Sequence, residues 1–152
     1  MSPARWLTFV LLITAIFSCS HPNDQQIKEL FNQMKAEAEA LNSQALCRHI
    51  SKHYQDNAGY NYFVICNLIK RYVDGLDELK VRMKISGIIL TKNQARASLE
   101  LVVRAKRGKK MFYLLGSNSL PEYPTIWLQK EGRSWKIIKV EGIKAGEEES
   151  WW

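Results

Sequence analysis

The sequence is poor in the residue combinations that mark most metal sites and nucleophilic enzymes. It has three cysteines and three histidines in 152 residues and no CxxC pair, which leaves no recognisable ligand set for a structural metal. A serine nucleophile elbow, a glycine-rich phosphate loop and an HExxH helix are also missing. No apolar run beyond the N-terminal segment approaches the roughly 20 residues that span a bilayer. We therefore expect no metal, no cofactor and no membrane-spanning helix.

The N-terminal segment has the order of a secretory signal. Arg5 is followed by an apolar run, Trp6–Phe17, and by the small residue Ser18, and this run is too short to cross a membrane. Residues 16–19, Ile-Phe-Ser-Cys, resemble a bacterial lipobox, which implies cleavage before Cys19 and acylation of its thiol. The alternatives are an ordinary secretory signal cut nearby and a buried apolar helix at the N-terminus.

Lipidation would place the chain in the cell envelope, attached to a membrane by acyl chains. In sorted lipoproteins, an aspartate directly after the cysteine keeps the protein in the inner membrane. Here Ser20 occupies that position. The resemblance thus implies the outer membrane, facing the periplasm. The predicted organisation is a signal peptide over 1–18, a lipidated tether over 19–23, a single domain over 24–142, and an acidic tail with two tryptophans over 143–152.

The composition predicts one compact domain, because 46% hydrophobic and 24% charged residues are ordinary for a globular protein. The net charge of +7 would suggest nucleic acid in a cytoplasmic protein. Export argues against that partner and favours anionic groups of the envelope. The dense basic patch comprises Arg104, Lys106, Arg107, Lys109 and Lys110. It fits either a contact with envelope phosphates or a solvated hairpin whose lysines protect a sheet edge.

Cys47 and Cys66 are the two cysteines that remain after cleavage. An exported protein matures where disulfides persist, so the two thiols are candidates for a bridge. Two small buried thiols on neighbouring helices are the alternative.

The first half of the chain has helical periodicity. Apolar residues recur at three- and four-residue steps from Ile27 to Leu41, after a start signal at 22–24. Asn42 and Ser43 predict the cap of a second, shorter helix that carries Leu46, Cys47 and Ile50. On that helix His49 and His53 would share a face. A third helix is predicted over 61–73, with an apolar face and an end at Asp74-Gly75; the face is formed by Ile65, Cys66, Leu68, Ile69 and Tyr72.

The second half alternates with a period of two. Strands are predicted over 79–85, 95–105, 111–115, 126–130 and 135–140. Because the helices come first and the strands follow without helical crossovers, the sequence predicts an α+β fold with helices packed on one face of a mostly antiparallel sheet.

This order of elements, the His53-Tyr54-Gln55-Asp56 turn and the closing stretch Gly132–Val140 resemble the nuclear transport factor 2-like (NTF2-like) superfamily, with its SnoaL-like members. The resemblance covers residues 24–142. It implies a curved sheet wrapped round a long helix as a cone, with a pocket at the open end for a small apolar ligand and dimers formed through the sheet. Members of this superfamily include enzymes and plain scaffolds, so fold does not decide function.

An enzyme of the SnoaL-like kind would need a carboxylate base and a hydrogen-bond donor in a pocket. Asp56, next to Tyr54 and Tyr60, is the candidate base. An aspartate in a turn more often accepts backbone hydrogen bonds. We therefore expect a non-catalytic, lipid-anchored protein that binds a ligand or a protein partner, with a SnoaL-like isomerase or hydrolase as the alternative and a homodimeric adaptor as a further hypothesis.

Overall fold

The computed structural model describes residues 22–143, and within them no helix is both long enough and apolar enough to cross a membrane. Helix α1, Pro22–Glu39, begins with proline, whose missing N–H is not needed in a first turn. The start lies two residues earlier than the predicted domain boundary at 24, inside the predicted tether. The helix ends in a Schellman-type turn at Leu41, which has a positive φ of 56°.

Helices α2, Ser43–Cys47, and α3, Tyr62–Val73, begin at asparagine caps. The cap of α2 agrees with the sequence prediction, whereas Asn61, predicted as the first residue of the third helix, caps it instead. The Asn42 side chain accepts a hydrogen bond from Ala45 N at 2.9 Å. Asn61 accepts from the backbone N–H groups of the first turn of α3 at 3.0 and 3.1 Å. These bonds satisfy donors that have no partner within the helix.

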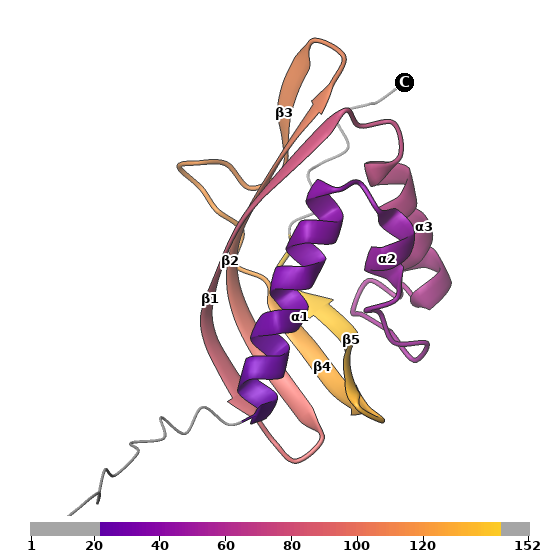
Figure 1. Ribbon diagram of the computed structural model, residues 1–152, viewed down its shortest axis with the longest axis vertical. Helices are drawn as coiled ribbons and strands as arrows, with labels where there is room; N and C mark the ends of the chain where they lie inside the picture. The colour runs from indigo at the N-terminus through magenta and orange to yellow at the C-terminus, as the bar shows by residue number, and fades with distance from the viewer. Residues whose placement is uncertain (1–21, 144–152) are drawn as a thin grey trace, which may run out of the picture.

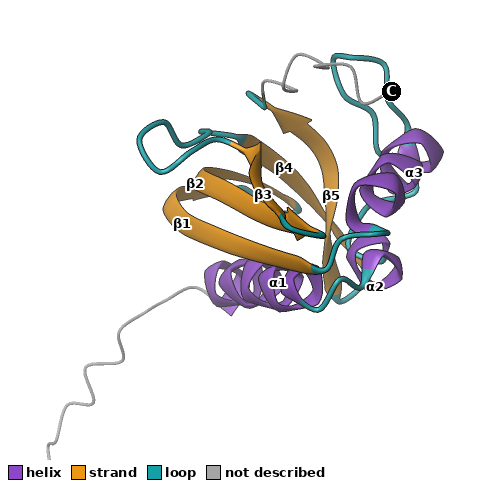
Figure 2. Ribbon diagram, turned by 90° about the horizontal axis from the view of Figure 1, so that it is seen from above, coloured by secondary structure: helices purple, strands orange, loops and turns teal. Residues whose placement is uncertain are grey.

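Five strands follow, and they form one sheet. They are β1, Glu78–Leu90; β2, Gln94–Arg107; β3, Lys110–Leu115; β4, Thr125–Glu131; and β5, Ser134–Glu141. All pairings between these strands are antiparallel. The structure thus confirms the predicted α+β class, and α1 lies against the sheet mainly at β1, with a smaller contact at β5 (Figures 1 and 2).

Strand β2 is paired along both edges. β1 pairs with it over nearly its whole length, apart from a bulge at Ser86. On the other edge, residues 94–98 pair with β4 and residues 103–107 pair with β3. Between them, Leu101 exchanges two backbone hydrogen bonds with Glu122, at 2.8 and 2.9 Å. The loop between β3 and β4 therefore continues the ladder.

The core lies between this sheet and α1. Ile27 and Phe31 of α1 are 0% and 3% exposed and belong to the same cluster as Ala97 and Leu99 of β2. The alanine side chains leave room for the helix to approach the sheet. A second cluster, near the C-terminal end of α1, joins the start of β1 to the end of β2 through Leu76, Leu79, Val103 and Ala105.

Three local predictions are wrong. The second helix ends at Cys47, and Ile50 instead forms a bridge with Ile137 of β5. The first strand extends to Leu90 rather than ending at 85. After the bulge at Ser86, its residues continue to pair with β2. In α3, Tyr72 is 51% exposed, so the predicted apolar face is narrower than expected.

Gly116 provides a test of the loop that continues the ladder. Its φ is +59°, and a Cβ there would lie 2.9, 3.0 and 3.1 Å from backbone atoms of Glu122, Leu120 and Leu101. Gly108 has nearly the same φ, +60°, but open space around it. We expect Gly108→Ala to lower the free energy of unfolding by roughly 1 kcal/mol, from backbone strain alone, and Gly116→Ala by roughly 3 kcal/mol or more. Urea unfolding of both variants tests this, and equal losses would contradict the close approach.

Candidate functional site

Asp56, the candidate base, is held by its own turn. Its Oδ1 accepts the backbone N–H groups of Ala58 at 3.0 Å and Tyr60 at 2.9 Å. Its Oδ2 accepts the hydroxyl of Tyr54 at 3.0 Å. Both carboxylate oxygens are therefore occupied by donors within four residues. This arrangement fixes a tight turn in the way that an aspartate commonly does.

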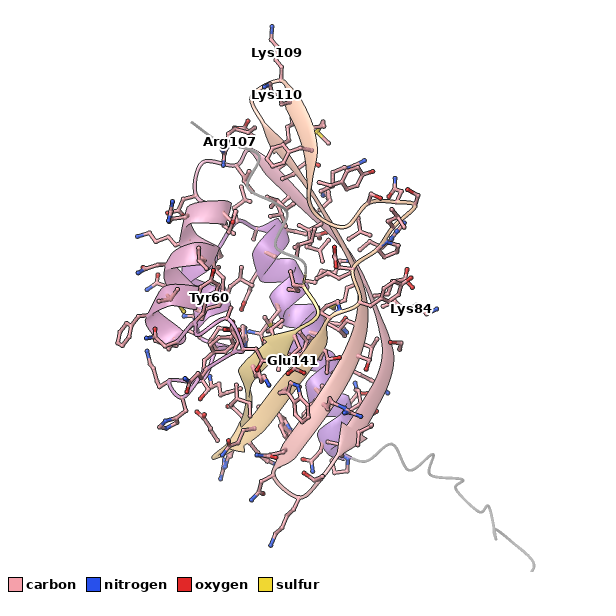
Figure 3. All side chains as sticks on the ribbon, turned by 180° about the vertical axis from the view of Figure 1, so that it is seen from behind. Tyr60, Lys84, Arg107, Lys109, Lys110 and Glu141 are labelled. Atoms are coloured by element: carbon pink, nitrogen blue, oxygen red, sulfur yellow. The ribbon has the colours of Figure 1, made fainter. Side chains whose placement is uncertain are left out.

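The structure brings only two of the three predicted pocket residues together by their side chains. Tyr54 is 2% exposed, whereas Tyr60 reaches Asp56 through its backbone and leaves its ring 41% exposed (Figure 3). Burial, together with the hydrogen bond to Asp56, raises the pKa of Tyr54 above its ordinary value. The Tyr54 phenol thus stays protonated at neutral pH and serves as a donor to Asp56.

Glu141, at the end of β5, ties the same loop to the sheet and was not predicted as a site residue. It accepts hydrogen bonds from Trp127 Nε1 at 3.0 Å and Asn57 Nδ2 at 3.1 Å, and it pairs with Lys139 at 2.5 Å. These bonds, that from Lys139 first, lower the pKa of the Glu141 carboxyl. Glu141 is therefore a second structural anchor of the 54–60 loop (Figure 3).

Cys47 and Cys66 lie side by side on α2 and α3. Both are thiols in this structure, with Cys47 Sγ 3.8 Å from the Cys66 carbonyl oxygen. Burial, followed by a hydrogen bond with the Cys66 side chain, raises the pKa of Cys47 to about 12. A thiol with such a pKa carries almost no thiolate at neutral pH and is a poor nucleophile. Both thiols are half-buried on neighbouring helices, and the bridge stays a prediction.

The histidines do not share a helix face, because α2 ends before them. His49 is buried, and its Nε2 lies 2.7 Å from Glu37 Oε2 of α1. Glu37 also accepts a hydrogen bond from Gln33 at 2.9 Å. His53 is exposed. Within residues 22–143 no group of three or more histidine, cysteine or acidic side chains is placed to hold a metal ion.

The predicted basic patch divides between two places. Arg107, Lys109 and Lys110 surround the tip of the β2–β3 hairpin (Figure 3). The tip is fixed to the turn before β1: Asp77 accepts the Gly108 N–H at 2.5 Å, and Arg107 Nε lies 3.3 Å from Gly75 O. Arg104 and Lys106 lie earlier in β2, opposite Lys80 and Glu78 of β1. The hairpin tip is thus a fixed cationic projection at one end of the molecule (Figure 1).

A second cationic site, which the sequence analysis missed, is a groove of about 380 Å³ between α1, the segment after α2, and the β4–β5 hairpin. Its cationic lining residues are Arg48, Arg133 and Lys136, and Glu29 is its one carboxylate. The groove therefore has a net charge of +2 when His49 is neutral. Gln26, Leu30, Gln33, His49, Ser134 and Trp135 complete the lining.

Trp135, which lines this groove, carries a buried polar atom without a partner among the described residues. The residue is 4% exposed, and its indole Nε1 is buried with no acceptor among the described residues. A buried donor without a partner costs roughly 1–3 kcal/mol. Lys130 lies over the indole ring at 5.8 Å. From the sequence, residues Gly132–Val140 are predicted only to form a closing hairpin. Nothing in the neighbouring residues indicates that this hairpin would lie beside Arg48 and form the groove with it.

No family profile matches the chain, and no curated protein sequence matches it. Solved structures do match in fold. An NTF2-like protein with a cystatin-like fold from Novosphingobium aromaticivorans has a TM-score of 0.59 and 14% identity, covering 82% of this chain and 83% of that one. A conserved protein from Planctomyces limnophilus has a TM-score of 0.66 and 8% identity, covering 79% and 94%.

Bd1075 of Bdellovibrio bacteriovorus has a TM-score of 0.60 and 16% identity, and the match covers 79% of this chain but only 40% of that one. These likenesses show that the fold is NTF2-like, as the sequence resemblance implies. At such low identity they show the fold alone.

The structural assignment of Asp56 makes a prediction about stability. Asp56→Ala removes the acceptor of three hydrogen bonds, so we expect the free energy of unfolding to fall by roughly 1–3 kcal/mol. Tyr54→Phe removes one of the three and should cost roughly 1 kcal/mol. Chemical denaturation measures both, with the exposed Tyr123→Phe as the control. An Asp56→Ala protein as stable as the parent would show that the carboxylate does not support the turn.

Proposed function

We propose that this chain is an exported lipoprotein whose NTF2-like domain acts as a non-catalytic binding module on the surface of an envelope membrane. The sequence of the N-terminal segment supports the anchor. The carboxylate that an enzyme would need is occupied by its own turn, which supports the non-catalytic role. The observation that carries the proposal furthest is the placement of α1 relative to the basic hairpin.

The start of α1 lies at one end of the domain and the hairpin tip at the other (Figure 1). Asn23, near the start of α1, accepts a hydrogen bond from Lys130 Nζ at 2.9 Å, and Lys130 N donates to Asn93 O at 2.8 Å. The start of α1, the β1–β2 turn and the end of β4 therefore lie together. Strand β1 spans the distance from the hairpin end to this end with 13 residues, a length of up to about 40 Å.

A lipid anchor at this end would place the hairpin tip at the far end of the domain from its own membrane. Two residues, Ser20 and His21, lie between Cys19 and Pro22, so this connection reaches at most about 11 Å. A lipid on Cys19 would therefore hold the start of α1 close to the leaflet while β1 spaces the tip from it. Arg107, Lys109 and Lys110 would then face away from the anchoring membrane and meet phosphate groups of an opposing envelope surface.

The face of the sheet opposite α1 does not favour a homodimer formed through the sheet. Lys80, Arg82 and Lys84 of β1 point to this face with Arg104 of β2, and all four are exposed. Figure 3 shows Lys84 projecting from it. Two copies stacked on this face would bring like charges together, which is unfavourable. We therefore propose that the domain acts as a monomer and binds an anionic partner.

Replacement of the acylated residue tests the anchor. Cys19→Ser should release the protein from the membrane fraction, because a single domain without its acyl chains has only weak electrostatic attraction to lipid. Cell fractionation and mass spectrometry of the membrane form provide the measurement, and Cys66→Ser is the matched control that should stay with the membrane. Recovery of Cys19→Ser with the membranes would refute the anchor.

Vesicle bridging tests the orientation. The acylated full chain, inserted in neutral phosphatidylcholine vesicles, should attach them to a second population that contains phosphatidylglycerol. Lys109→Gln with Lys110→Gln should weaken bridging by about 30-fold, from about 1 kcal/mol for each lysine. The matched control, Lys28→Gln with Lys92→Gln, removes the same charge near the start of α1 and should have little effect. Equal losses in the two double variants would contradict the proposed orientation.

A further inference from the structure

We infer that the groove between α1, the segment after α2 and the β4–β5 hairpin is a binding site for a phosphate group. This inference rests on the proposed binding function and adds to it a second site with a stated ligand chemistry. Its basis is three cations from two segments that are far apart in the chain. Arg48 follows α2, whereas Arg133 and Lys136 come from the β4–β5 turn and β5, and the fold brings all three to one groove.

The guanidinium groups of Arg48 and Arg133 are unpaired within residues 22–143: no carboxylate or carbonyl of that region binds either group. The ammonium of Lys136 donates to the backbone oxygen of Arg48, which holds it beside the groove with two further N–H donors. Arginine guanidinium groups match the geometry of phosphate oxygens through paired N–H donors. The groove thus contains cationic N–H donors that have no hydrogen-bond acceptor among the described residues.

The opposing charges nearby are already engaged. Glu29 accepts a hydrogen bond from Gln25 at 3.0 Å. Glu37 Oε2 lies 2.7 Å from His49 Nε2, so this carboxylate faces the histidine at the back of the groove rather than the arginines. The net positive charge therefore remains available. The buried indole of Trp135, which has no acceptor among the described residues, forms part of the wall.

The position of the groove is compatible with two sources of phosphate. Three of the four lining residues of α1, Gln26, Glu29 and Leu30, belong to its first half, the half nearer the proposed anchor. A lipid headgroup and a free phosphate compound are thus both within reach, and both present the same oxyanion. The test must distinguish them.

Two-dimensional NMR of the acylated full chain in detergent micelles provides the test, with the indole N–H signal of Trp135 as the reporter. One titration uses inorganic phosphate, and a second uses micelles doped with phosphatidic acid. We expect the Trp135 signal to shift in a saturable manner with at least one probe. If the Trp135 signal shifts with inorganic phosphate, the groove binds a soluble phosphate compound. If it shifts only with phosphatidic acid, the groove binds a lipid headgroup.

Charge-matched variants make the result specific. Arg48→Gln with Arg133→Gln should raise the dissociation constant at least ~10-fold, because it removes both paired-donor groups. Lys109→Gln with Lys110→Gln, at the far end of the domain, should change it less than about two-fold. Unchanged backbone spectra confirm folding of each variant. No saturable shift with either probe, or equal weakening by both double variants, overturns the inference.

A failure here leaves the proposed function standing, since membrane attachment through Cys19 does not involve the groove. Fractionation of the Arg48→Gln, Arg133→Gln protein separates the two outcomes. It should remain in the membrane fraction whichever way phosphate binding turns out. Release of that variant from the membrane would instead show that the groove, rather than the acyl group, retains the protein, and would refute the proposed anchor.

Discussion

Strand β2 is the element on which the rest of the structure depends, because it is hydrogen-bonded along both edges. β1 occupies one edge, while β4, the Glu122 bridge and β3 occupy the other in succession. Its inward side chains also form the surface on which α1 packs, with Ala95 and Ala97 at 3% and 0% exposure. Loss of this one ladder would therefore detach both ends of the sheet and remove the base of the core.

Much of this architecture could be predicted from the sequence, because it is encoded in periodicity and in local hydrogen-bonding residues. The apolar stripe that begins at Ile27 predicts α1, and alternation in 95–105 predicts β2. Asn42 and Asn61 mark the helix starts by side-chain chemistry that acts within three residues. The predictions of local structure fail where a contact with a residue far along the chain determines the conformation. Ile50 leaves the helical pattern because Ile137, far along the chain, pairs with it.

The candidate sites show the same division. The role of Asp56 in its turn could be anticipated, since all its partners lie within four residues of it. The groove could not, because Arg48 and Arg133 have no local feature that distinguishes them from other surface arginines. Only the fold brings them to one place beside a buried tryptophan. Residues that act through their neighbours in space, rather than in sequence, need the tertiary structure to be recognised.

The two cationic regions lie toward opposite ends of a domain that would be attached by a very short connector. Such a molecule would work as a spacer of fixed height, since the sheet is continuous from the attached end to the free end. Partners would then be selected by their distance from the leaflet as well as by their charge. With the domain upright, the hairpin tip would not reach a polyanion that lies on the anchoring bilayer. It would reach one that extends across the gap between the membranes, and binding would require little conformational change.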